Sequence, residues 1–163
     1  MARLLIVHHT SSPSMQAMLE AVLAGAGTDE IEGVEAVVRP ALAATVTDTL
    51  EADGYLLGTP ANIGYISGAL KHFFDTIYYP CLEATTGRPY AAYIHGNLGT
   101  EGAVRALESI TTGLRWRAVA PASSVSGAPS AADRETLREL GGTIGDVMSR
   151  LSSRGFGAHL ALL

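Results

Sequence analysis

The sequence predicts an α/β protein, a three-layer sandwich in which helices cover a five-stranded parallel sheet with strand order 2-1-3-4-5. Continuous apolar runs, typical of strands buried on both faces, occur at residues 4–7, 54–58 and 90–94. Segments with apolar residues at helical spacing separate the strands, so strand and helix alternate five times along 163 residues. Right-handed crossovers between successive strands then give a parallel sheet.

The first two strand–helix units precede residue 51. After the strand at residues 4–7, apolar side chains line one face of a helix over residues 15–23. Residues 34–39 alternate between outward and inward positions, which indicates a strand at the edge of the sheet. Residues 41–50 form a weakly helical or irregular crossover.

The third unit contains the most informative segment of the chain. Its strand at residues 54–58 ends in a sharp loop at residues 59–64. Ser67 is the expected N-cap of the following helix, because a serine hydroxyl can accept a hydrogen bond from the first turn. Pro80 is expected to stop that helix.

The last two units complete the alternation. A strand at residues 90–94 is followed by a helix with an apolar stripe over residues 103–110, and residues 115–119 form the fifth strand. Ser130 and Asp133 have the spacing of an N-terminal capping box, which predicts the start of the last helix.

Composition narrows the class of protein. A hydrophobic fraction of 47% without a composition shift predicts one domain over residues 1–163. No apolar run approaches the roughly 18 residues that a membrane span needs, and the strand begins too early for a signal peptide. A net charge of −5 without a basic cluster argues against nucleic acid. The single cysteine, Cys81, fits a cytoplasmic protein.

Three loops follow the first, third and fourth strands, and the predicted strand order brings them together at the carboxyl edge of the sheet. The first loop is rich in hydroxyl groups and opens a helix, whose free N–H groups and dipole suit a phosphate. We expect it to bind a phosphate through Thr10, Ser11, Ser12, Pro13, Ser14 and Met15.

The second loop combines a proline with glycines, which allow backbone to approach a flat partner closely. We expect its binding residues to be Pro60, Ala61, Asn62 and Ile63. The third loop also contains spaced glycines, although their match to a dinucleotide-binding fingerprint is weak and lies late in the fold. Its candidate binding residues are His95, Gly96, Asn97 and Gly102.

The pattern GTP-x-N-x-G-x-x-SG-x-L-K-x-F-x-D, which begins at Gly58, resembles the isoalloxazine-binding loop of flavodoxin-like flavoproteins. The likeness is greatest to NADPH-dependent FMN reductases and NAD(P)H:quinone reductases. The first loop resembles the flavodoxin phosphate loop T-x-T-G-x-T but departs from it at Pro13 and Met15. The resemblance extends from Leu4 to about Val119.

This resemblance implies a flavodoxin-like fold with FMN as cofactor and NAD(P)H as electron donor. A hydride passes from NAD(P)H to FMN, and the electrons then pass to a quinone, a free flavin or a similar small acceptor. FMN carries the chemistry, so no catalytic side chain is expected, and His95 is the candidate donor to the flavin O2/N1 region. A second subunit often completes such a site, which implies a homodimer or homotetramer.

A flavodoxin-type electron carrier without its own substrate is the alternative. Carriers flank the flavin with aromatic and acidic side chains, whereas the third loop has no aromatic residue and only Glu101 as an acid. Glycines at positions 96, 99 and 102 are expected to leave an open slot for a nicotinamide. This favours the enzyme.

Other chemistries fit less well. A response-regulator receiver needs acidic residues where this chain has His8, His9 and Thr59. A low-molecular-weight phosphatase needs five residues between its cysteine and arginine, whereas six separate Cys81 from Arg88. Adjacent histidines at a strand end point to opposite faces, so no metal site is expected.

Overall fold

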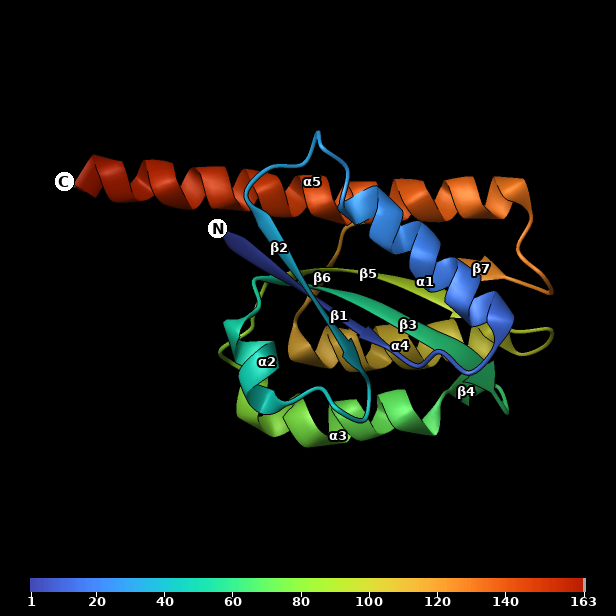
Figure 1. Ribbon diagram of the computed structural model, residues 1–163. Coiled ribbons are helices and arrows are strands. Elements are labelled where there is room, and N and C mark those ends of the chain that lie inside the picture. The colour runs from blue at the N-terminus through green and yellow to red at the C-terminus, as the bar shows by residue number, and fades with distance from the viewer. Residues whose placement is uncertain (163) are drawn as a thin grey trace.

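The computed structural model describes residues 1–162, with the side chains of residues 1–154, as a sheet between two layers of helices (Figure 1). The strands are β1 (Ala2–His8), β2 (Val34–Pro40), β3 (Gly54–Asn62), β4 (Tyr65–Ile66), β5 (Pro89–His95), β6 (Arg117–Ala118) and β7 (Ser123–Val125). The helices are α1 (Pro13–Ala26), α2 (Val46–Glu51), α3 (Gly68–Cys81), α4 (Thr100–Leu114) and α5 (Ala131–Leu162). Among the described residues, no helix is both long and apolar enough to span a membrane.

The parallel sheet has the order β2-β1-β3-β5-β6, with β7 also paired to β5. This confirms the flavodoxin-like order 2-1-3-4-5, with the fourth predicted strand as β5. The predicted extent of the fifth strand, residues 115–119, was wrong. The strand is divided into two short pieces, β6 and β7, which both pair with β5. Arg115 has a left-handed φ of 60° at the end of α4, and Pro121, which lacks an N–H, lies between the two pieces.

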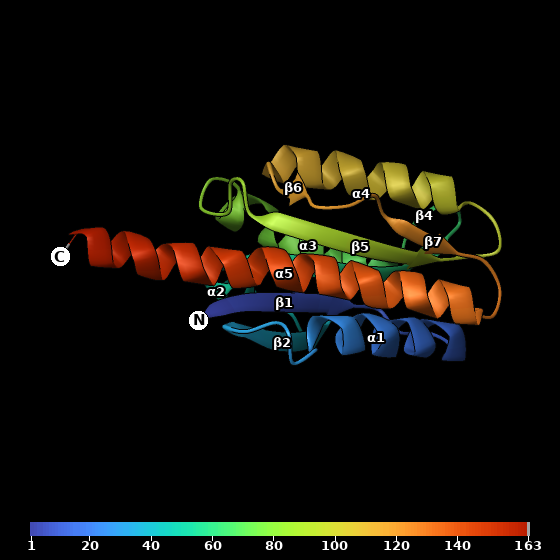
Figure 2. The same cartoon turned by 90° about the horizontal axis from the view of Figure 1, so that it is seen from above.

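The two faces of the sheet support two separate cores. Side chains that alternate along each strand point to opposite faces, so neighbouring residues belong to different cores. Leu5, Tyr55 and Leu57 pack under α3 and α4, whereas Leu4, Ile6 and Leu56 pack under α1 and α5. Figure 1 shows these helices in separate layers, and Figure 2 looks down on the layer of α1 and α5.

The third unit differs from its prediction in two places. The prediction of a loop at residues 59–64 is wrong. β3 continues to Asn62, and the chain then turns back to form the antiparallel strand β4. Ser67 does cap α3, accepting the N–H of Leu70 at 3.2 Å. Pro80 does not end α3, which continues to Cys81. Because Pro80 lies in the last turn, the hydrogen bond that it cannot donate interrupts the helix only near its end.

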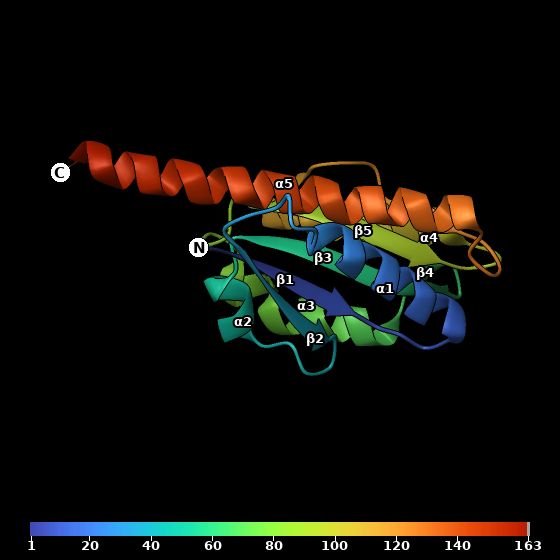
Figure 3. The ribbon, with the colours of Figure 1, turned by 45° about the horizontal axis from the view of Figure 1, so that its top comes forward.

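Glycines allow α1 and α5 to lie side by side on one face of the sheet (Figure 3). A Cβ added to Gly141 of α5 would lie 2.1 Å from the carbonyl oxygen of Val22, closer than any real contact. Gly25 of α1 has a similar contact, because its Cβ would lie 1.9 Å from the Arg138 carbonyl oxygen. The two helices can therefore approach this closely only because Gly25 and Gly141 have no side chains.

We expect Gly141→Ala to destabilise the protein by about 1–3 kcal/mol, because the new methyl group must push two backbones apart. Gly142→Ala is the matched control, since its Cβ would lie 3.8 Å from the nearest atom, the Gly25 carbonyl oxygen. There the higher helix propensity of alanine should stabilise by about 0.5–1 kcal/mol. Urea unfolding measures both, and equal effects would contradict the close contact.

Candidate functional site

Three loops meet at the carboxyl edge of the sheet, on the right of Figure 1. They are the β1–α1 loop, the β3–β4 hairpin and the β5–α4 loop, each at the end of one of three neighbouring strands. The order of the strands brings together segments that lie more than thirty residues apart in sequence. Parallel α/β sheets hold their ligands at this edge.

The β1–α1 loop prepares the N-terminus of α1 for an anion. Ser12 is the N-cap, and its Oγ accepts the Met15 N–H at 3.2 Å while its carbonyl accepts the Gln16 N–H at 3.0 Å. Pro13 stands at the first helical position, where a missing N–H costs nothing. The Ser12 hydroxyl hydrogen and the Ser14 amide then remain as donors for a ligand.

Two histidines lie where β1 ends and this loop begins. His8 Nδ1 lies 2.7 Å from the Thr10 hydroxyl oxygen. Burial, with a smaller contribution from the neighbouring His9, lowers the pKa of His8. His9 donates its backbone N–H to the Gly58 carbonyl at 2.9 Å, and its Nδ1 is buried without a hydrogen-bond partner among the described residues. A buried orphan nitrogen beside the loop is a polar group for which a ligand can supply a partner.

The second loop is a tight hairpin. Asn62 pairs with Tyr65, and the two residues between them, Ile63 and Gly64, have positive φ angles of 51° and 69°. Both angles are typical of a type I′ turn, but a β-branched residue rarely adopts one. The Ile63 side chain is fully exposed at the tip. Backbone strain of this kind is common at ligand-binding sites.

The third loop is held by the segment after β7. His95 Nε2 lies 2.8 Å from the Gly127 carbonyl oxygen, and the Gly127 N–H donates to Asn97 Oδ1 at 3.2 Å. Because a carbonyl can only accept, Nε2 carries a hydrogen in this contact. Nδ1 is therefore the ring atom left for a ligand, and it can donate only when the imidazole is protonated.

Glycines allow the hairpin to pack directly against the third loop. A Cβ on Gly102 would lie 2.1 Å from the Gly64 carbonyl oxygen, and one on Gly99 would lie 2.9 Å from Gly64 Cα. A Cβ on Gly96 would lie 3.0 Å from the Ala61 Cβ. The expectation that these glycines leave an open slot is therefore wrong, because protein atoms fill the space beside each of them.

The predicted binding residues thus lie on the three loops that meet at this edge, and their contact with a ligand stays a prediction. Sequence reasoning left His8, His9 and Gly127 out of the site. The adjacent histidines at a strand end were the available signal for the first two, whereas Gly127 is brought in by β7, which the sequence did not reveal. Tyr78 and Tyr79 lie at the far end of α3, away from the three loops.

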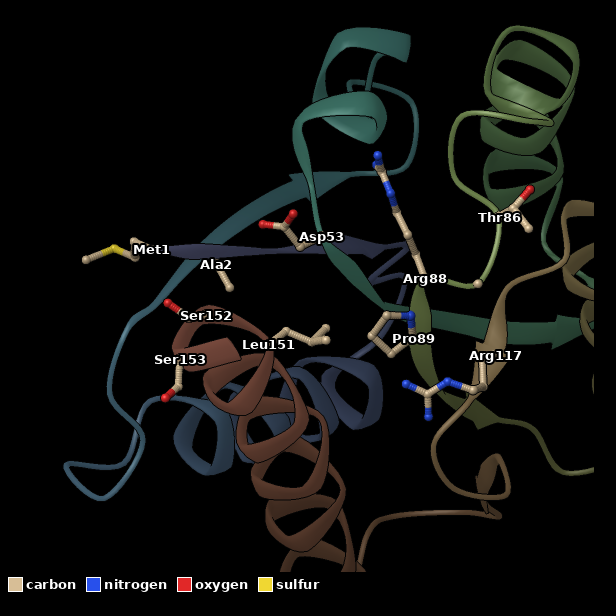
Figure 4. A pocket seen from close by; sticks show the side chains of 11 residues that line it. Met1, Ala2, Asp53, Thr86, Arg88, Pro89, Arg117, Leu151, Ser152 and Ser153 are labelled. Carbon is tan, nitrogen blue, oxygen red and sulfur yellow. The ribbon is translucent and has the colours of Figure 1, made fainter. Parts of the chain in front are cut away.

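A separate cavity of about 790 Å³ opens at the amino edge of the sheet (Figure 4). Asp53, Arg88, Arg117 and Ser152 are among its lining residues, and none of the predicted binding residues is. Arg88 is already engaged, since its guanidinium donates to the Leu50 and Ala52 carbonyls at 2.9 and 2.6 Å. It closes the C-terminal end of α2 and has a structural role.

Known proteins are similar to this chain in both sequence and fold. A flavodoxin from Aquifex aeolicus (strain VF5) is 35% identical over 77 residues, which is 47% of this chain and 40% of that protein's length. The chain therefore spans well under two thirds of this curated relative.

Solved structures share the fold at low identity. An archaeal flavodoxin superimposes with a TM-score of 0.76 and 19% identity over 90% of this chain and 98% of its own. The flavodoxin, WrbA-like protein from Agrobacterium tumefaciens gives 0.71 and 18% over 94% and 99%. The family model of NADPH-dependent FMN reductase matches residues 10–130, which include all three loops. The chain therefore belongs to the NADPH-dependent FMN reductase family.

Proposed function

We propose that the protein is an FMN-dependent NAD(P)H oxidoreductase that reduces a quinone, a free flavin or a similar small acceptor. The observation that carries the proposal is the meeting of a hydroxyl-rich helix N-terminus, a strained hairpin and a glycine-rich loop at one sheet edge, within the segment that matches the reductase family. The same resemblance supports NAD(P)H as the electron donor.

The residues present fit FMN. Its phosphate is suited to the start of α1, where the Ser12 hydroxyl and the Ser14 amide remain as donors and His9 Nδ1 lacks a partner among the described residues. The flat ring is suited to the hairpin and the third loop, which offer backbone and apolar side chains. Ile63 and Leu98 expose such side chains there.

The chain's own groups would bind and orient FMN, which supplies the two-electron chemistry when bound. Ile63 and Leu98 would exclude water from the ring edges, because both are apolar and fully or largely exposed without a ligand. His95 would stabilise negative charge on the pyrimidine side through a protonated Nδ1, since Nε2 is held by Gly127. No side chain need act as acid, base or nucleophile.

An electron carrier is the second candidate, and the curated flavodoxin relative favours it. Partner docking by a carrier depends on a charged rim, whereas the exposed rim here includes the apolar Ile63 and Leu98. An apolar rim suits an apolar acceptor, or a second subunit that completes the site. We therefore favour the enzyme, working as a homodimer or homotetramer on small molecules.

Replacing Ser12 and Ser14 together by alanine should weaken FMN binding by about 2–4 kcal/mol, because the charge-assisted hydrogen bonds from the two hydroxyl groups to the phosphate are lost while the Ser14 amide remains. Riboflavin lacks the phosphate and should bind almost unchanged. Fluorescence titration with both ligands measures the difference. Ser12→Ala also removes the helix cap, at a cost of about 1 kcal/mol in stability. Each titration is therefore made under conditions in which the variant is fully folded. Equal losses for both ligands would exclude the phosphate role.

Gly102→Ala should separate the hairpin from α4 and weaken the binding of both FMN and riboflavin by roughly tenfold or more, because the ring site loses its shape. Gly68→Ala is the matched control at the start of α3, since its Cβ would meet no atom within 4 Å. It should leave both affinities unchanged. A selective loss of FMN alone in Gly102→Ala would show that Gly102 acts on the phosphate instead.

Anaerobic mixing of the FMN-loaded protein with NADPH or NADH tests the function itself. The visible flavin band should bleach in one two-electron step, and a benzoquinone should restore it with repeated turnover. The reductase proposal fails if neither nucleotide bleaches the band while dithionite does so in two separate one-electron steps. That outcome would identify an electron carrier.

A further inference from the structure

The phosphate loop contains no permanent positive charge. Between Val7 and Glu20 the chain has no lysine, arginine or acid, so the only side chains there that can become cationic are His8 and His9. FMN carries a phosphate that is largely dianionic near neutral pH. The charge on this anion must therefore be met by the α1 terminus, by neutral donors, or by a histidine that gains a proton.

His8 is in contact with one of those neutral donors. Its Nδ1 lies 2.7 Å from Thr10 Oγ1, which is a short hydrogen bond, and Thr10 belongs to the predicted phosphate loop. We propose that His8 is a positioning residue that aims the Thr10 hydroxyl hydrogen at the FMN phosphate and takes up a proton when FMN binds. The inference rests on the FMN site proposed above.

The argument follows from counting hydrogens. Thr10 has one hydroxyl hydrogen. If His8 Nδ1 is bare, Thr10 must donate to it, and no hydrogen remains for a phosphate oxygen. If Nδ1 carries a hydrogen, it donates to Thr10 Oγ1, and the threonine hydrogen is free for the phosphate. Phosphate binding therefore selects the form of His8 that is protonated at Nδ1.

A charge argument favours the imidazolium over a mere change of tautomer. Without a ligand, burial and the neighbouring His9 lower the pKa of His8, so the ring is mostly neutral near pH 7. A dianion one hydrogen bond away raises that pKa again. A proton is taken up on binding wherever the pH lies between the two values, so FMN affinity should fall as pH rises through that window.

Among the described residues, the two strand partners of His8 carry no charge. β1 pairs His8 with Gly58 on one side and Pro40 on the other. On β2, Arg39 pairs with Val7 and so lies on the other face of the sheet from His8, where it is 3.7 Å from Asp48 of α2. From β5, the Tyr93 ring packs on Gly58, and burial raises the pKa of its phenol, which stays neutral. His9 is the titratable neighbour whose charge acts on His8, and it needs its own variant.

The test measures dissociation constants for FMN and riboflavin from about pH 6.5 to 8.5, above the phosphate pKa of about 6. The wild-type protein should lose FMN affinity with rising pH, by up to roughly tenfold per unit. Riboflavin affinity should be flat. His8→Asn keeps an N–H donor near the Nδ1 position but cannot titrate, so its FMN affinity should become independent of pH.

His8→Phe removes the donor, and FMN should bind roughly tenfold more weakly than to wild type at the lower pH, as for one lost charge-assisted hydrogen bond. In a Thr10→Val background the same change should cost nothing further, because His8 acts through Thr10. His72→Asn, an exposed histidine on α3, is the matched control and should behave as wild type.

The results separate this inference from the proposed function. If the wild-type protein does not bind FMN, both are wrong. If it binds FMN with the same pH response as His8→Asn, the proton coupling alone is wrong. A response that disappears in His9→Asn and persists in His8→Asn would also overturn the assignment to His8.

Discussion

The geometry of the candidate site depends on one close contact between backbones. The carbonyl of Gly64, at the hairpin tip, occupies the space where a Cβ of Gly102 would lie, only 2.1 Å away. No side chain larger than hydrogen allows the hairpin to approach the first turn of α4 in this way. The contact joins the segments that follow β3 and β5, so the second and third loops form one continuous wall of the site. The first loop is joined to the same wall through the His9 N–H and the Gly58 carbonyl.

The same contact explains why the turn tolerates strain. Ile63 has a φ of 51°, which costs a β-branched residue of the order of 1–3 kcal/mol. Asparagine or glycine would relieve this strain. The neighbouring Gly64 is fixed by α4, and Asn62 and Tyr65 are paired across the hairpin, so Ile63 has no freedom to relax. A strained, fully exposed apolar side chain beside a binding edge is consistent with a function for that side chain outside the fold.

Local patterns were sufficient to predict the fold, and long-range contacts were not. Apolar runs and helical spacing predicted the strand order, and short-range capping signals located the starts of α3 and α5. The hairpin was hidden because Ile63 stands where type I′ turns prefer asparagine or glycine. The split fifth strand depends on pairing with β5, which no local pattern encodes. The role of Gly102 could not be predicted either, since its neighbour lies 38 positions earlier in the sequence.

The distribution of charge makes the carboxyl edge receptive to an anion. The four longer helices α1, α3, α4 and α5 begin at this edge, so the positive ends of their dipoles lie there. Arg3, Arg88 and Arg117 lie at the opposite edge, where Arg88 donates to the terminal carbonyls of α2. Arg88 thus balances the negative end of α2, and the first turn of α1 contains no charged side chain that would compete with a ligand. An anion held by dipoles and neutral donors depends on how each hydroxyl is oriented, which is why a histidine bonded to Thr10 has influence there.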